Sequence, residues 1–150
     1  MKYIAAFLLI LLFPVFTITQ CSKSKQEQTA DKKVEQSLEQ QVGLLFKEHC
    51  ATANCHRGER PKKKLDLEPN KFVASTVDVA SLELPDLKLI DTLEPENSYL
   101  LKKVRGDEDI VDDRMPEDAP SLTPEQIQLI LDWALELQAS EQAADSTSSM

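Results

Sequence analysis

Apolar residues recur with the period of an α-helix in three segments of the chain. Over residues 34–49 they are spaced by three and four positions, while Glu and Gln fill the opposite face. This pattern predicts an amphipathic helix, whose apolar face is formed by Val34, Leu38, Val42, Leu45 and Phe46. Residues 96–104 predict a shorter helix. It should end at Gly106, because glycine readily adopts the left-handed conformation of a helix C-cap.

The clearest helical pattern begins at Thr123. This residue is a natural N-cap, Pro124 suits the first helical position, and Gln126 completes a capping box. A broad apolar stripe follows, made of Ile127, Leu129, Ile130, Leu131, Trp133, Ala134 and Leu137. The stripe ends near Ala139, and the small polar residues 140–150 predict a disordered tail.

The segments between these helices carry weaker signals. Residues 70–79 have room for one or two helical turns, and residues 81–94 alternate loosely between breakers at Pro85 and Pro95. Residues 107–120 are acidic and loop-like. With only 3 glycines and 5% aromatic residues in 150 positions, the composition argues against an all-β protein.

The N-terminal segment predicts export. A short basic start precedes residues 3–18, which are almost all apolar, and a polar stretch follows. The apolar run is too short for a spanning helix, so we interpret residues 1–20 as a signal peptide. We therefore expect the mature protein to lie outside the cytoplasm, on the periplasmic side.

Cys21 closes this segment in the manner of a bacterial lipoprotein cleavage site, although Gln20 stands where a small residue is usual. A lipidated Cys21 would anchor the chain to a membrane. Residues 21–33 have no apolar pattern and predict a flexible tether between that anchor and a folded domain. The alternative is an ordinary signal peptide followed by an unrelated cysteine.

The chain is acidic, with 17 Lys and Arg against 26 Asp and Glu and a formal net charge of −9. This balance argues against binding to nucleic acid, which calls for a basic face. It suits solubility or a basic partner. Residues 57–64 are a local exception, rich in Arg and Lys. We interpret them as a solvated loop, with a docking patch for an acidic partner as the alternative.

The chemistry of the chain is concentrated at Cys50, Cys55 and His56. Cys-x-x-Cys-His is the attachment signature of a c-type haem. In it, each thiol adds to one vinyl group of the porphyrin, and the adjacent histidine is held under the iron as an axial ligand. Here the spacer between the thiols is four residues, Ala51-Thr52-Ala53-Asn54. The sequence predicts a covalent haem at this variant motif.

A second axial ligand is expected opposite the histidine, and a methionine thioether is a common choice. Met115 is the only methionine inside the domain, because Met1 belongs to the predicted signal peptide and Met150 ends the tail. It lies on the acidic loop and precedes Pro116. Its polar neighbours argue against the alternative, a methionine that only fills the core.

Four segments together carry a family resemblance: the Cys50–His56 motif, Pro-Glu-Asn-Ser-Tyr-Leu-Leu-Lys-Lys-Val at residues 95–104, Arg-Met-Pro around Met115, and Leu-Thr-Pro-Glu-Gln-Ile-Gln-Leu-Ile-Leu-Asp-Trp at residues 122–133. In this order they resemble the single-haem class I cytochrome c domain. More narrowly, they are similar to bacterial domains with a four-residue spacer in the haem motif. The resemblance covers residues 34–137.

This resemblance implies a small all-α domain over residues 34–139, with the first and last helices packed across each other around one covalent haem c. It implies that Cys50 and Cys55 carry the haem, that His56 is the proximal ligand and that Met115 is the distal one. It also implies a one-electron carrier that works with redox partner proteins and performs no bond chemistry on a substrate.

Two rival readings remain open. A small haem peroxidase would need an open sixth position and a distal acid–base group, for which His49 is the only spare histidine. A haem-free binding module would use Cys50 and Cys55 as a disulfide or as half of a zinc site. His49 would otherwise lie at the end of the first helix. Trp133 either donates to a haem propionate or packs in the core.

Overall fold

The computed structural model describes residues 36–148, and these are mostly helical. The prediction of a helical domain is confirmed at this level. Within the described range, β structure is limited to two isolated bridges, Val77 with Ile90 and Ala80 with Lys88. The α-helices are α1 (Leu38–His49), α2 (Phe72–Thr76), α3 (Tyr99–Arg105) and α4 (Pro124–Ser148), and two 3-10 helices are η1 (Lys62–Lys64) and η2 (Pro95–Asn97).

The predicted signal peptide, Cys21 and the tether of residues 21–33 lie outside the described residues. Among residues 36–148, no helix combines the length and the apolar character needed to cross a membrane.

Helix α1 begins at Leu38 because Ser37 caps it. The Ser37 side chain accepts a hydrogen bond from the Gln40 backbone at 3.2 Å, and Gln40 Oε1 accepts one from the Ser37 backbone at 3.3 Å. This reciprocal capping satisfies amide groups that a helix start leaves without partners. The helix therefore starts inside the predicted segment, and its buried face carries the predicted Val42, Leu45 and Phe46.

Helix α4 begins as predicted. Gln126 Oε1 accepts a hydrogen bond from the Thr123 backbone at 2.8 Å, and Thr123 Oγ1 accepts one from the Gln126 backbone at 3.3 Å. The end of the helix differs, because it continues to Ser148 and the predicted disordered tail is helical over residues 140–148. Residues 141–147 are exposed. They contain good helix formers and no breaker. The apolar stripe marks only the part of α4 that packs on the core, so it did not predict this exposed extension.

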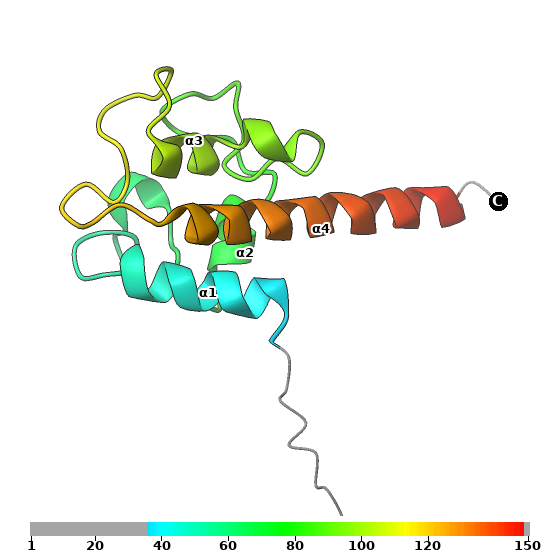
Figure 1. Cartoon of the computed structure of the whole chain (residues 1–150), viewed down its shortest axis with the longest axis horizontal. Helices are drawn as coiled ribbons and strands as arrows, with labels where there is room; N and C mark the ends of the chain where they lie inside the picture. Colours follow the sequence, from blue (N-terminus) through cyan, green and yellow to red (C-terminus); the bar gives the residue numbers. More distant parts are fainter. Residues whose placement is uncertain (1–35, 149–150) are drawn as a thin grey trace, which may run out of the picture. The chain divides into compact units, whose positions relative to one another are not determined.

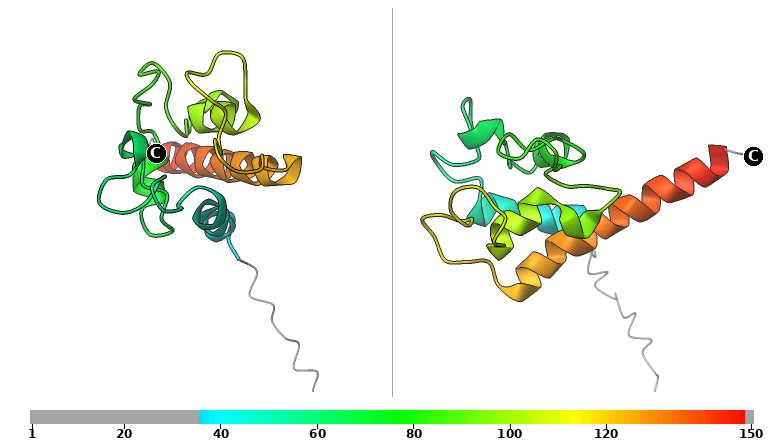
Figure 2. Two further views of the ribbon diagram at one scale, coloured as in Figure 1. Left: turned by 90° about the vertical axis from the view of Figure 1, so that its left-hand side faces the viewer. Right: turned by 90° about the horizontal axis from the view of Figure 1, so that it is seen from above.

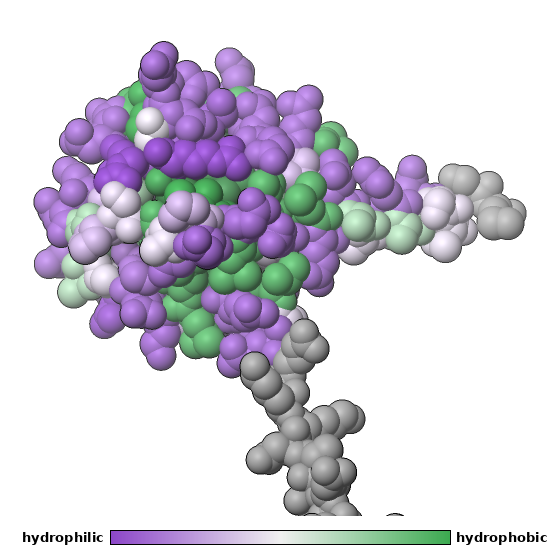
Figure 3. All heavy atoms as spheres, viewed as in Figure 1, coloured by the Kyte–Doolittle hydropathy of each residue, from purple (hydrophilic) through white to green (hydrophobic). Residues whose placement is uncertain are grey.

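The last turns of α4 extend past the other helices, as Figure 1 and the view from above in Figure 2 show. The first half of α4 packs against α1 and α3. In the same view as Figure 1, Figure 3 shows hydrophobic residues in the middle of the molecule's surface, bordered by hydrophilic ones. The helices that the resemblance expects to contact each other, the first and the last, do so.

An aromatic stack forms the centre of the core. The Phe72 ring lies 5.5 Å from the Phe46 ring in an edge-on arrangement and 5.2 Å from the Trp133 ring. Each of the three side chains comes from a different helix, and each is 0–1% exposed. Gly43 of α1 permits this approach, because a Cβ at that position would lie 3.1 Å from the Phe72 ring. The stack therefore fixes α1, α2 and α4 relative to one another.

Candidate functional site

The four-residue spacer forms a compact loop at the end of α1. The amide of Cys55 donates to the Thr52 carbonyl at 3.1 Å, and the amide of His56 donates to the Cys50 carbonyl at 3.2 Å. Asn54 has a φ of 65°, a left-handed conformation that asparagine tolerates better than most residues. The loop therefore folds back on itself and returns His56 to the helix end that carries Cys50.

The ring of His56 is oriented by a backbone carbonyl. Its Nδ1 lies 3.3 Å from the oxygen of Leu65, and since a carbonyl can only accept, the proton resides on Nδ1. Nε2 then keeps its lone pair. Burial lowers the pKa of His56 by disfavouring the charged ring, although hydrogen bonds to backbone carbonyls oppose this. A neutral histidine with one ring nitrogen fixed in this way has the arrangement usual for a metal ligand.

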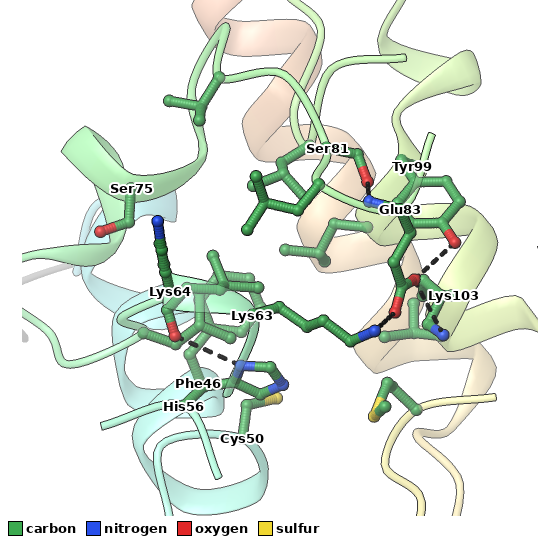
Figure 4. A pocket seen from close by; sticks show the side chains of 18 of the residues that line it. Phe46, Cys50, His56, Lys63, Lys64, Ser75, Ser81, Glu83, Tyr99 and Lys103 are labelled. Carbon is green, nitrogen blue, oxygen red and sulfur yellow. Dashed lines mark hydrogen bonds and ion pairs between the residues drawn. The ribbon is translucent and has the colours of Figure 1, made fainter. Parts of the chain in front are cut away.

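Cys50, His56 and Met115 line one cavity of about 300 Å³, a size at the lower end of the range for small-molecule and cofactor sites. Figure 4 shows the cavity with Cys50 and His56 at its base. Its walls are mainly apolar and come from α1, α3 and the segments between them, including Phe46, Leu65, Leu67, Leu89, Leu100 and Val104. Three of the predicted site residues thus share one pocket, whereas Cys55 is not part of its lining.

Cys50 and Cys55 are free thiols and form no disulfide with each other. The pKa of Cys50 is raised from 9.0 to about 12, first because burial disfavours the thiolate and then because of Cys55 nearby. No group of three or more His, Cys, Asp or Glu side chains in residues 36–148 is arranged to hold a metal ion.

Met115 is held in place by α3. Its amide donates to the carbonyl of Lys103 at 2.9 Å, and its side chain is half-buried against the hydrophobic core. The alternative considered from the sequence, a methionine that packs in the core, therefore agrees with part of its surroundings. The side chain nonetheless reaches the cavity that His56 also lines, which is what a pair of ligands on one iron would need.

A charged cluster around the buried Glu83 also faces this cavity, and the sequence analysis missed it. Glu83 accepts a hydrogen bond from the Tyr99 hydroxyl at 2.7 Å and forms ion pairs with Lys63 at 2.9 Å and Lys103 at 3.3 Å (Figure 4). Burial alone would raise the pKa of Glu83, but these partners outweigh it and the pKa lies below 4.5. The sequence offered one signal for this cluster: Tyr99 and Lys103 are four residues apart in a predicted helix and so lie on the same face. No sequence pattern pointed to Glu83.

His49 and Trp133 lie elsewhere. The Nε2 atom of His49 is 3.2 Å from Gln126 Nε2 of α4, and neither His49 nor Trp133 lines the cavity. Trp133 packs on Phe72 in the core, and its Nε1 has no acceptor among the described residues. The expected position of His49 at the end of the first helix is confirmed. Within residues 36–148, the distal acid–base histidine that a peroxidase would need is not in the cavity.

The basic loop of residues 57–64 is only partly free. Lys62 pairs with Glu117 at 3.5 Å, and Lys63 pairs with Asp112 at 3.3 Å in addition to Glu83. These contacts join the segment after His56 to the loop that carries Met115. Solvent screens such exposed pairs, so they bring the two loops together without locking them.

Comparison of the chain with models of known families, with curated proteins and with solved structures found no match.

Proposed function

We propose that this protein is an electron-transfer c-type cytochrome. In this proposal Cys50 and Cys55 attach one haem, His56 is the proximal ligand and Met115 is the distal ligand. The observation that carries it is the cavity: a thiol, a neutral imidazole and a thioether from two distant parts of the chain line the same apolar pocket. Nitrogen and thioether sulfur are the donors of the His/Met class of haem sites.

The attached haem would supply a one-electron redox couple. The residues of this chain supply the rest. His56 presents Nε2 while the Leu65 carbonyl holds the opposite ring nitrogen, and Met115 contributes a soft sulfur that favours the reduced iron. The apolar walls keep water away from the site. The Lys63 side chain extends across the cavity to Glu83, and 52% of it is exposed (Figure 4).

The proposal extends to location and partners. A signal peptide over residues 1–20 and lipidation at Cys21 would place the domain on the periplasmic side of a membrane, where haem attachment takes place in this class of protein. Redox partner proteins are the expected partners. The net charge of −9 favours basic ones for general attraction, and the exposed Arg57 and Arg60 offer a small patch of opposite sign.

The decisive experiment is a mass measurement after expression with a periplasmic haem-attachment system. The purified chain should carry the additional mass of one haem after acid denaturation, and it should show a reduced-minus-oxidised difference in the visible spectrum. Cys50→Ser should leave at most one thioether. Cys21→Ser removes a thiol outside the motif and is the matched control, since it should retain the full haem mass.

An unmodified mass from a host that matures a reference c-type cytochrome in parallel would refute the proposal. A haem mass that survives denaturation in the double variant Cys50→Ser/Cys55→Ser would refute the assigned attachment residues.

A further inference from the structure

Glu83 is the centre of a network rather than one member of an ion pair. Its side chain is 8% exposed, and the carboxylate meets three donors: Tyr99 Oη at 2.7 Å, Lys63 Nζ at 2.9 Å and Lys103 Nζ at 3.3 Å. Lys103 is itself 9% exposed on its side chain. A buried ammonium without a counter-charge would be strongly unfavourable, so Glu83 is what allows Lys103 to lie at this position.

Each of the three partners of Glu83 also contacts the loop that carries Met115. The Tyr99 hydroxyl accepts a hydrogen bond from the Val111 amide at 3.1 Å, and Lys103 Nζ donates to the Val111 carbonyl at 2.7 Å. Lys63 Nζ reaches Asp112 Oδ2 at 3.3 Å. The Met115 loop is thus held at the amide and the carbonyl of Val111 and at the side chain of Asp112.

The orientation of these groups depends on Glu83. The Tyr99 hydroxyl has one hydrogen, and since it donates that hydrogen to Glu83, its lone pairs face the Val111 amide. Lys103 uses one N–H on Glu83 and another on the Val111 carbonyl. Its own backbone carbonyl accepts the Met115 amide at 2.9 Å. The same α3 residue therefore holds the loop at Val111 and at Met115.

We propose that Glu83 is a positioning residue for Met115. It orients Tyr99 and Lys103, and these fix residues 111–115 so that the Met115 side chain enters the cavity. As a statement about the iron ligand, this rests on the proposed function. As a statement about what holds the loop, it is independent of any cofactor. Glu83 touches neither Met115 nor His56 in the described hydrogen bonds and ion pairs.

The test uses the full chain as purified, with Glu83→Ala, Glu83→Gln and Tyr99→Phe. The matched control is Glu96→Gln, because Glu96 also pairs with a cation of α3, Arg105, at 2.8 Å, yet its described contacts do not involve the Met115 loop. Two measurements are made on each variant. One is amide hydrogen exchange at Val111 and Met115; the other is the weak far-red absorption band of a methionine–iron bond, together with carbon monoxide binding after reduction.

Glu83→Ala should accelerate exchange at Val111 and Met115 by about five- to tenfold, the effect of one lost hydrogen bond. Tyr99→Phe should do so at Val111 alone. Glu83→Gln keeps an acceptor for Tyr99 and should rescue part of the loss. In parallel, Glu83→Ala should weaken the far-red band and admit carbon monoxide, while Glu96→Gln should match the wild type in all respects.

The proposal is overturned if exchange at Val111 and Met115 in Glu83→Ala equals that of Glu96→Gln. It is also overturned if exchange accelerates while a far-red band present in the wild type stays unchanged. A wild-type chain without haem would sink the proposed function instead. The exchange data alone would then decide whether Glu83 holds the loop. Should Glu83→Ala fail to fold, exchange equal to that of Glu96→Gln in both Glu83→Gln (at Val111 and Met115) and Tyr99→Phe (at Val111) overturns the proposal.

Discussion

Replacing Gly43 by alanine is predicted not to stabilise the protein, although this glycine lies inside a helix. In the middle of α1, replacing glycine by alanine would ordinarily stabilise a helix by about 0.8–1.0 kcal/mol. Here the added Cβ would lie 3.1, 3.6 and 3.8 Å from three carbons of the Phe72 ring. The shortest of these is tighter than an ordinary van der Waals contact, so the ring would have to move.

The ring has little room to do so. Phe72 is 1% exposed, and Phe46 and Trp133 lie on it at ring separations of 5.5 and 5.2 Å. Overpacking a closely filled core costs about 1–3 kcal/mol. Subtracting the gain in helix propensity leaves a net destabilisation by Gly43→Ala of about 0–2 kcal/mol. Phe46 also lines the cavity, so part of this strain should reach the site.

Urea unfolding of the full chain, with and without Phe72→Leu, measures the effect as a double-mutant cycle. In the Phe72→Leu background the contact is relieved, and Gly43→Ala should become stabilising by up to about 1 kcal/mol. A stabilisation of that size in both backgrounds would show that the Phe72 ring yields freely. The reasoning from close packing would then be wrong.

Three further predictions concern the site and the anchor. Met115→Ala should abolish the far-red band, lower the reduction potential and open the iron to carbon monoxide, whereas His49→Ala should change none of these; the reverse result would indicate a bis-histidine iron. Cys21→Ser should move the protein from the membrane to the soluble fraction, and a wild type that is already soluble would contradict lipidation. Burial, followed by the hydrogen bond to Glu83, raises the pKa of Tyr99 from 10.0 to about 12. Its contribution to stability should therefore be complete below pH 10 and be lost as the pH rises toward 12, and Tyr99→Phe should remove that phase from an alkaline unfolding curve.

The helices could be predicted where their buried faces repeat over several turns. In α4 the capping box at Thr123 and the stripe through Ile130 and Ala134 both correspond to observed contacts or burial. The end of α4 could not be predicted in this way, because residues 140–147 are exposed and carry no apolar stripe in the sequence.

The segment of residues 81–94 resisted prediction for a different reason. It is held by two isolated backbone bridges and by hydrogen bonds from backbone amides to side chains, rather than by a repeating apolar face. Ser81 Oγ accepts from the amides of Glu83 and Leu84, and Asp91 Oδ1 accepts from those of Leu93 and Glu94. Such turns have short local signals, and they decide where Glu83 points.

The residues of the candidate site also differ in how far they could be predicted from the sequence. Cys50 and His56 are close in sequence, so one motif was enough to predict them as neighbours. Met115 was assigned by its loop context and by the absence of a rival methionine, and the structure brings it to the same cavity. The Glu83 network joins residues that are far apart in the chain, and no spacing rule brings such a set together before the fold is known.

The raised pKa of Cys50, about 12, has a consequence for the life of the newly made chain. At pH 7 a thiol with that pKa is almost entirely protonated, and the thiolate is the form that attacks disulfides and other electrophiles. An exported chain would meet an oxidising compartment in which free cysteines tend to be captured. Burial at the end of α1 makes this sulfur a poor nucleophile there.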